Sequence, residues 1–134
     1  MPKVLIATEK PFAAAAVQKI KAELDAAGYA HAWLENYTDP KDLHTAVADA
    51  DALIIRSDKV DEAVFAAAPK LKIVVRAGAG YDNIDLAAAT AHNVVAMNTP
   101  GQNSNAVAEL ALARMIYMAR GKFNGKSGSE LAGK

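Results

Sequence analysis

The sequence contains no cysteine among its 134 residues. Disulfide bonds and thiolate metal sites are therefore excluded as sources of stability or of chemistry. An excess of charge of one sign is absent too, because fifteen basic side chains offset fifteen acidic ones. The overall charge thus gives the chain no attraction to nucleic acid or to an anionic membrane surface.

Targeting signals and long apolar runs are also missing from the sequence. No segment approaches the roughly 20 apolar residues that a membrane-spanning helix requires. The opening Met1-Pro2-Lys3 leads at once into a strand-like run and is not typical of a signal peptide. We therefore expect a cytoplasmic protein, and its 52% hydrophobic and 22% charged residues suit a globular domain with a substantial core.

Short apolar strands alternate with amphipathic helices over the first hundred residues. The expected strands are 4–7, 30–34, 52–55, 73–76 and 94–97, and the expected helices are 12–27, 40–48, 61–68 and 85–91. Gly28 stands where a helix C-cap glycine belongs, and Asp39-Pro40 supply an N-cap and a first helical residue. The alternation predicts an α/β fold, a flavodoxin-like doubly wound five-stranded parallel sheet. Because the second strand has polar surroundings, we expect it at a sheet edge, in the order 2-1-3-4-5.

Residues 73–85 combine a buried strand, a glycine-bearing turn and the start of a helix. Glycines after such a strand let the backbone approach a ligand and point N–H groups at an anion. Polar clusters also follow other strands, at residues 8–10, 56–58 and 98–103. Ligands of open parallel sheets bind beyond the carboxyl ends of the strands. The convergence of these clusters predicts a carboxylate or phosphate site at that edge.

A further helix is expected at residues 105–120, and it is apolar on nearly every side. Such a helix is buried on more than one face, whereas a single α/β domain covers only one. We therefore expect it to contact a second domain or a second subunit, with an over-long core helix as the alternative. Residues 121–134, rich in Gly, Ser and Lys, are typical of a linker. The expected organisation is a substrate-binding domain at 1–102, an interdomain or dimerisation helix within 103–120, and a linker at 121–134.

Three motifs follow one another in the second half of the chain. They are Arg76-Ala77-Gly78-Ala79-Gly80-Tyr81-Asp82-Asn83-Ile84-Asp85, Asn98-Thr99-Pro100-Gly101 and Asn103-Ser104-Asn105-Ala106-Val107-Ala108-Glu109-Leu110. Together they resemble the N-terminal segment of D-isomer-specific 2-hydroxyacid dehydrogenases, and the resemblance covers essentially the whole chain. Within that family, Ile55-Arg56-Ser57 and Val75-Arg76-Ala77-Gly78 are most similar to the D-3-phosphoglycerate dehydrogenases.

The resemblance implies the substrate-binding half of an NAD-dependent oxidoreductase of serine biosynthesis. In the family, hydride passes between C2 of the hydroxy acid and nicotinamide, and a His–Glu pair serves as acid and base. The dinucleotide glycine motif does not occur in these 134 residues, because Asn83 stands where a third glycine would be needed. The family's catalytic residues do not occur in them either. We therefore expect no catalytic, cofactor-binding or metal-binding residue here, and no activity from this chain alone.

The resemblance also implies which residues would bind a small anionic hydroxy acid such as 3-phosphoglycerate. Backbone N–H groups of the glycine turn would take its carboxylate, two arginines and a serine its phosphate, and an asparagine would face the cofactor domain. These residues are, in chain order, Arg56, Ser57, Arg76, Gly78, Ala79, Gly80 and Asn103. Guanidinium groups suit this role because they make paired, charge-assisted hydrogen bonds to phosphate.

Simpler roles are open for the same positions. The glycines can merely permit a tight turn, Arg56 can form an ion pair with Asp58 or Asp61, and Asn103 can simply begin a helix. Asp82, Asn83 and Asp85 are interpreted as turn and cap residues, and the scattered His31, His44 and His92 as surface residues. The alternative function is an α/β scaffold without a ligand, which forms a homodimer through residues 105–120, folded back or exchanged between chains. A phosphoacceptor receiver and a flavin binder both lack their required residues after the first strand.

Overall fold

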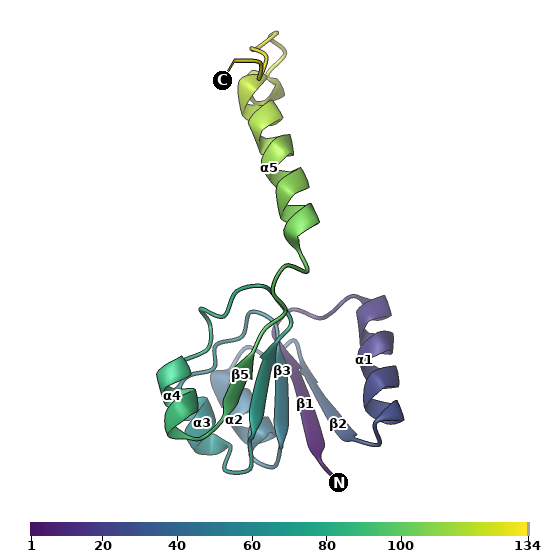
Figure 1. Ribbon diagram of the computed structural model, residues 1–134, viewed down its shortest axis with the longest axis vertical. Helices are drawn as coiled ribbons and strands as arrows, with labels where there is room; N and C mark the ends of the chain where they lie inside the picture. Colours follow the sequence, from purple (N-terminus) through teal and green to yellow (C-terminus); the bar gives the residue numbers. More distant parts are fainter. Residues whose placement is uncertain (134) are drawn as a thin grey trace. The chain divides into compact units, whose positions relative to one another are not determined.

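A five-stranded parallel sheet forms the centre of the computed structural model, which describes residues 1–133 (Figure 1). Its strands are β1 (Lys3–Thr8), β2 (Ala30–Glu35), β3 (Ala52–Ile55), β4 (Ile73–Arg76) and β5 (Val95–Met97). They lie in the order β2-β1-β3-β4-β5, and every neighbouring pair is parallel. The predicted α/β fold and strand order are therefore confirmed.

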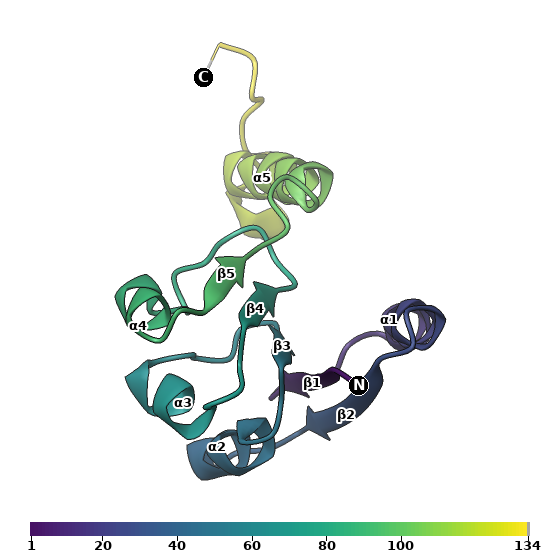
Figure 2. The ribbon, with the colours of Figure 1, turned by 60° about the horizontal axis from the view of Figure 1, so that its bottom comes forward.

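Four helices connect or follow these strands and cover both faces of the sheet. They are α1 (Ala14–Ala26), α2 (Pro40–Val47), α3 (Glu62–Ala67) and α4 (Leu86–Ala91). Figure 2 shows α2, α3 and α4 on one face of the sheet and α1 on the other. Because all the strands are parallel, the polar loops at their carboxyl ends gather at one edge of the sheet, where ligands of such sheets bind.

The helix ends follow the capping rules that their sequences indicate. Gly28 adopts φ +70°, and the N–H of Tyr29 donates to the carbonyl of Leu24 at 3.0 Å, which ends α1 in a left-handed C-cap. Asp39 accepts a hydrogen bond from the N–H of Lys41 at 2.9 Å, and Pro40 opens α2. The caps predicted at Gly28 and Asp39 are therefore confirmed.

One hydrophobic core fills the space between the sheet and the α2–α4 layer. Alternate strand residues enter it, because successive side chains of a strand point to opposite faces. Its largest fully buried side chains include Leu5, Leu53, Ile55, Val64, Phe65 and Val74. The α1 face is packed less completely, since α1 has no fully buried residue and Ile73 and Val75 stay half-buried there. The α2–α4 side therefore supplies most of the hydrophobic stabilisation.

The chain divides into two compact units, Met1–Pro100 and Gly101–Lys134, and the sheet and core belong to the first. The second unit contains α5 (Ser104–Ala119) and a short 3-10 helix at Gly121–Phe123. Its tail returns to the end of α5, where the N–H of Ser129 donates to the carbonyl of Ala119 at 2.7 Å. A Cβ on Gly128 would lie 2.6 Å from that carbonyl oxygen, so only glycine fits this approach. Among residues 1–133, no helix combines the length and apolarity needed to cross a bilayer.

Phe65 tests the importance of the core on the α2–α4 side. Its side chain is 1% exposed and stacks on His92 at a ring-centroid distance of 5.9 Å. We expect Phe65→Ala to lower the free energy of unfolding by about 3–5 kcal/mol, because the change removes buried apolar area and leaves a cavity. Urea denaturation followed by circular dichroism measures this loss. The matched control Phe123→Ala removes a 65% exposed ring and is expected to cost less than about 1 kcal/mol. Similar losses in both variants would contradict this description of the core.

Candidate functional site

Two arginines end neighbouring strands at the carboxyl edge of the sheet. Arg76 is the last residue of β4 and pairs in register with Ile55, so Arg56 begins the loop beside it. The Nε of Arg76 donates to the backbone carbonyl of Arg56 at 2.9 Å. The pairing of β3 with β4 and this hydrogen bond together place the Arg76 guanidinium against the backbone of Arg56 at the carboxyl edge.

The guanidinium of Arg56 is oriented by backbone groups from the loop after β1. Its Nη1 donates to the carbonyls of Lys10 and Pro11, each at 3.0 Å, and its charge lies 5.4 Å from the ring centroid of Phe12. Carbonyl acceptors and an aromatic face leave the positive charge of a guanidinium uncompensated. Within residues 1–133, no ion pair joins Arg56 to Asp58 or Asp61. Arg56 therefore retains Nε and Nη2 as donors for an anion.

The guanidinium of Arg76 makes fewer close polar contacts than that of Arg56. Besides the bond from its Nε, its Nη1 lies 3.8 Å from a carboxylate oxygen of Asp82, whose side chain is 93% exposed. An ion pair at that distance with an exposed partner contributes little energy. Arg76 consequently has guanidinium donors that an incoming anion can take over.

The glycine turn after β4 approaches the Arg76 side chain closely. A Cβ on Gly80 would lie 2.6 Å from Nη1 of Arg76, so a larger residue at this position would displace that guanidinium. The N–H of Gly78 donates to the carbonyl of Arg76 at 2.9 Å, whereas those of Ala79 and Gly80 have no acceptor within residues 1–133. Asn98 supports the turn from the next loop, since its Nδ2 donates to the carbonyl of Ala79 at 2.6 Å. Two of the three predicted carboxylate-binding amides therefore remain available.

Asp58 connects three loops of the edge through hydrogen bonds to a buried carboxylate. Its side chain is 2% exposed; Oδ1 accepts from the N–H of Glu9 at 2.8 Å and from the hydroxyl of Tyr37 at 2.7 Å. Oδ2 accepts from the N–H of Arg56 at 3.2 Å. Asn83 adds a fourth loop, because its Nδ2 donates to the backbone carbonyl of Asp58 at 2.7 Å. Sequence reasoning treated Asp58 only as a partner for Arg56 and missed this role.

The predicted substrate residues divide between the two units of the chain. Arg56, Arg76 and the glycine turn share one edge of the sheet, and Ser57 lies exposed beside Arg56. Asn103 belongs to the second unit, where it occupies the N-cap position of α5 without a side-chain capping bond. The structure thus brings six of the seven positions to one edge, and their binding role stays a prediction.

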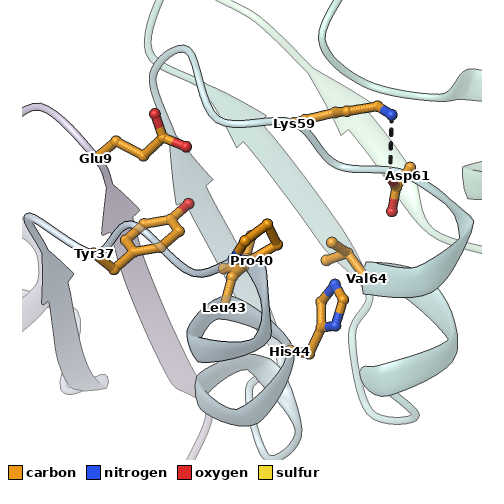
Figure 3. Close-up of a pocket in the computed structure, with 8 residues that line it drawn as sticks. All are labelled: Glu9, Tyr37, Pro40, Leu43, His44, Lys59, Asp61 and Val64. Carbon is orange, nitrogen blue, oxygen red and sulfur yellow. Dashed lines mark ion pairs between the residues drawn. The ribbon is translucent and has the colours of Figure 1, made fainter.

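The edge also contains a cavity that the sequence did not indicate. It has a volume of 210 Å³ and is lined by Glu9, Tyr37, Pro40, Leu43, His44, Lys59, Asp61 and Val64 (Figure 3). No predicted substrate residue lines it, and His44, interpreted from sequence as a surface residue, forms part of its wall. The cavity lies on the Glu9–Tyr37 side of Asp58, whereas the substrate residues lie on the Arg56 side.

The start of the helix that follows the glycine turn does not fit the pyrophosphate of NAD. Dinucleotide folds place that group at the free N-terminus of a helix that follows a glycine turn. Here the helix after the glycine turn is α4, whose N-terminus is occupied by Asp85; its Oδ1 accepts from the N–H of Ala88 at 2.9 Å. A carboxylate at that position repels a pyrophosphate. Residues 1–133 likewise contain no group of three side chains arranged to hold a metal ion.

Fold and edge together define a flavodoxin-like α/β domain with a basic, glycine-bearing carboxyl edge. The sequence profile of the "D-isomer specific 2-hydroxyacid dehydrogenase, catalytic domain" matches residues 4–130. The chain therefore belongs to the D-isomer specific 2-hydroxyacid dehydrogenase family. This result confirms the family resemblance of the three sequence motifs.

Individual relatives agree with this assignment. A D-3-phosphoglycerate dehydrogenase of Mycobacterium leprae is 49% identical over 89 residues, which are 66% of this chain and 17% of that protein. A glyoxylate reductase of Thermococcus litoralis is 41% identical over 93 residues, covering 65% of this chain and 28% of that protein. The crystal structure of an NAD⁺-bound 3-phosphoglycerate dehydrogenase from Entamoeba histolytica superposes with a TM-score of 0.93 at 48% identity, over 97% of this chain and 43% of that one. The chain thus spans less than half the length of each of these relatives.

Tyr37 gives the Asp58 network a measurable dependence on pH. Burial, followed by the hydrogen bond and the negative charge of Asp58, raises the pKa of Tyr37 above its ordinary value of 10.0. In the unfolded chain the phenol ionises near pH 10, whereas in the folded chain it stays protonated. Folded-state stability from this group is therefore complete below pH 10 and is lost as pH rises further, by about 1.4 kcal/mol per pH unit.

We expect Tyr37→Phe to lower the free energy of unfolding at pH 7 by about 1–2 kcal/mol and to remove this alkaline loss. Urea denaturation of parent and variant between pH 7 and pH 11 measures both effects. Tyr29→Phe, at a 43% exposed position, is the control and is expected to keep the alkaline loss. An unchanged alkaline slope in Tyr37→Phe would show that Tyr37 is not held by Asp58.

Proposed function

We propose that this chain is the substrate-binding part of an NAD-dependent D-3-phosphoglycerate dehydrogenase, and that it does not catalyse the reaction alone. One observation carries the proposal. The Nε of Arg76 bonds to the carbonyl of Arg56, so the unpaired Arg56 and the weakly paired Arg76 lie at one edge beside the free amides of Ala79 and Gly80. That combination suits a ligand with a carboxylate at one end and a phosphate at the other.

Each part of this edge has a distinct task in the proposal. The N–H groups of Ala79 and Gly80 donate to the substrate carboxylate, and the turn holds C2 of the hydroxy acid toward the cofactor. Arg56 and Arg76 bind the phosphate through charge-assisted hydrogen bonds, and the exposed hydroxyl of Ser57 adds a donor. Asn103 contributes where the substrate meets the cofactor domain. The relatives' names, D-3-phosphoglycerate dehydrogenase among them, support this choice of ligand.

Hydride transfer needs a nicotinamide, which NAD supplies in the relative whose NAD⁺-bound structure is known. The residues of this chain bind and orient the hydroxy acid, but they include no dinucleotide glycine motif. Asp85 also blocks the helix end at which a pyrophosphate would bind. The cofactor and the acid–base residues are therefore assigned to parts of the enzyme outside these 134 residues.

Titration with 3-phosphoglycerate, followed by amide chemical shifts in NMR spectra, tests the substrate assignment. We expect saturable shifts at Arg56, Ser57, Ala79 and Gly80, with weak affinity because an open edge buries little of so small a ligand. Arg56→Gln is expected to weaken binding by about tenfold or more, since it removes a charged donor.

The matched control for this titration is Arg114→Gln, which removes an exposed arginine of α5 and should leave the affinity unchanged. A separate titration with NAD should give no saturable shifts. Saturable binding of NAD would contradict the assignment. A chain that responds to neither ligand would favour the second candidate function.

The second candidate is an α/β scaffold that associates as a homodimer through α5. The helix offers apolar side chains that are more than half exposed, namely Val107, Leu110, Leu112, Met115 and Met118. Exposed apolar patches of this kind mark association surfaces, and the commonest assembly is a dimer with two-fold symmetry. Dimerisation through residues 105–120, with or without exchange of the helix, is compatible with substrate binding and is proposed alongside it.

Light scattering at tens of micromolar tests the dimer. We expect twice the chain mass of 14.0 kDa for the parent and the single-chain mass for the double variant Leu112→Glu with Ile116→Glu, because buried carboxylates at the interface are costly. Ser127→Glu adds a carboxylate in the tail beyond α5 and should leave the dimer intact. A monodisperse monomer of the parent protein would rule the interface out.

A further inference from the structure

The cavity between the loop after β1, α2 and the start of α3 has an apolar floor and a polar rim (Figure 3). Pro40, Leu43 and Val64 form the floor. At 210 Å³ it is smaller than the roughly 300–1,000 Å³ typical of sites for drug-sized ligands. An occupant therefore has only a few non-hydrogen atoms and places an apolar part on this floor.

One wall of the cavity presents two hydrogen-bond acceptors. The Glu9 carboxylate forms no ion pair and no hydrogen bond within residues 1–133. The hydroxyl of Tyr37 donates a hydrogen bond to Oδ1 of Asp58 at 2.7 Å, and its oxygen can still accept a hydrogen bond from a ligand. The phenol of Tyr37 is neutral at physiological pH, since its ordinary pKa of 10.0 is raised further by burial. The wall therefore suits a group with several donors and a positive charge.

Asp58 fixes the hydroxyl of Tyr37 and the backbone of Glu9 before any ligand arrives. Its Oδ1 accepts from the backbone N–H of Glu9 at 2.8 Å as well as from Tyr37. The carboxylate is 2% exposed and cannot itself contact a ligand. The Tyr37 hydroxyl therefore loses little freedom on binding, which favours affinity.

On the opposite wall, the charges of Lys59 and Asp61 neutralise each other. Lys59 forms an ion pair with Asp61 at 3.3 Å, and Asp61 also accepts from the N–H of Ala63 at 3.2 Å. Figure 3 shows the Lys59 ammonium directed toward Asp61 and away from Glu9. Among the three charged residues Glu9, Lys59 and Asp61, Glu9 therefore contributes the uncompensated charge, which is negative; His44 also lines the cavity and forms no ion pair within residues 1–133. An anion is disfavoured here, in contrast to the Arg56 side of Asp58.

We propose that this cavity binds a small molecule that carries a primary ammonium group on a short apolar chain. The ammonium donates to the Glu9 carboxylate and to Oη of Tyr37, and the chain packs on Pro40, Leu43 and Val64. The site is separate from the proposed hydroxy-acid site and does not depend on that proposal. Both a simple amine and an apolar amino acid possess this chemistry.

The test is a titration of the ¹⁵N-labelled chain with isobutylammonium chloride in an amine-free buffer at neutral pH. The expected result is saturable amide shifts at Glu9, Tyr37, Leu43 and Val64, with saturation at millimolar concentrations. A parallel titration with isobutyrate, which has the same carbon skeleton but a negative charge, should give none. L-valine separates the two sources: binding as tight as that of the amine identifies an amino-acid site, and weaker binding identifies an amine site.

Glu9→Gln is expected to weaken the binding of isobutylammonium by about tenfold or more, because it removes the charge that pairs with the ammonium. The Glu9 side chain makes no hydrogen bond, so this variant keeps the fold. Glu23→Gln, on α1 at the opposite face of the sheet, is the matched control and should bind like the parent. The proposal is overturned if neither ammonium compound gives saturable shifts at these residues, if isobutyrate binds equally well, or if Glu9→Gln leaves the affinity unchanged.

Discussion

The buried carboxylate of Asp58 is the interaction on which the carboxyl edge of the sheet depends. A charge removed from water is stable only when hydrogen bonds replace its hydration, and three donors from three loops do so here. The same bonds fix the loop after β1, the residues before α2 and the start of the Arg56 loop. The anion-compatible side and the cavity are therefore two sides of one hydrogen-bonded wall, with opposite charge preferences.

Most of the fold could be predicted because its determinants are local. The apolar run of β4, the C-cap at Gly28 and the Asp39-Pro40 helix start each depend on residues adjacent in sequence, and each lies where expected. The polar surroundings of β2 placed this strand at the edge of the sheet, and the order follows from that position. Boundaries shifted by one or two residues, as for α1, which begins at Ala14 rather than Phe12, because helix ends are set by individual hydrogen bonds.

The candidate site could be predicted only in part, since its geometry depends on contacts between distant residues. Strand-end position identified Arg56 and Arg76 as neighbours, and the bond between them agrees with that reasoning. Nothing near Asp58 in the sequence indicates Tyr37 or Glu9 as partners, which lie 21 and 49 positions away. The cavity was missed for the same reason, because its floor combines α2 with α3 and its acceptors come from two other loops.

The contacts that orient Arg56 determine which mutations the loop after β1 tolerates. Its Nη1 bonds to the carbonyl oxygens of residues 10 and 11, not to their side chains. Side-chain replacement at Lys10 therefore leaves the acceptor in place, and alanine scanning would score this position as unimportant. Insertion or deletion of one residue in the same loop moves both carbonyls and releases the guanidinium. Loop length, more than the side chains at positions 10 and 11, is thus the quantity that this loop must preserve as its sequence diverges.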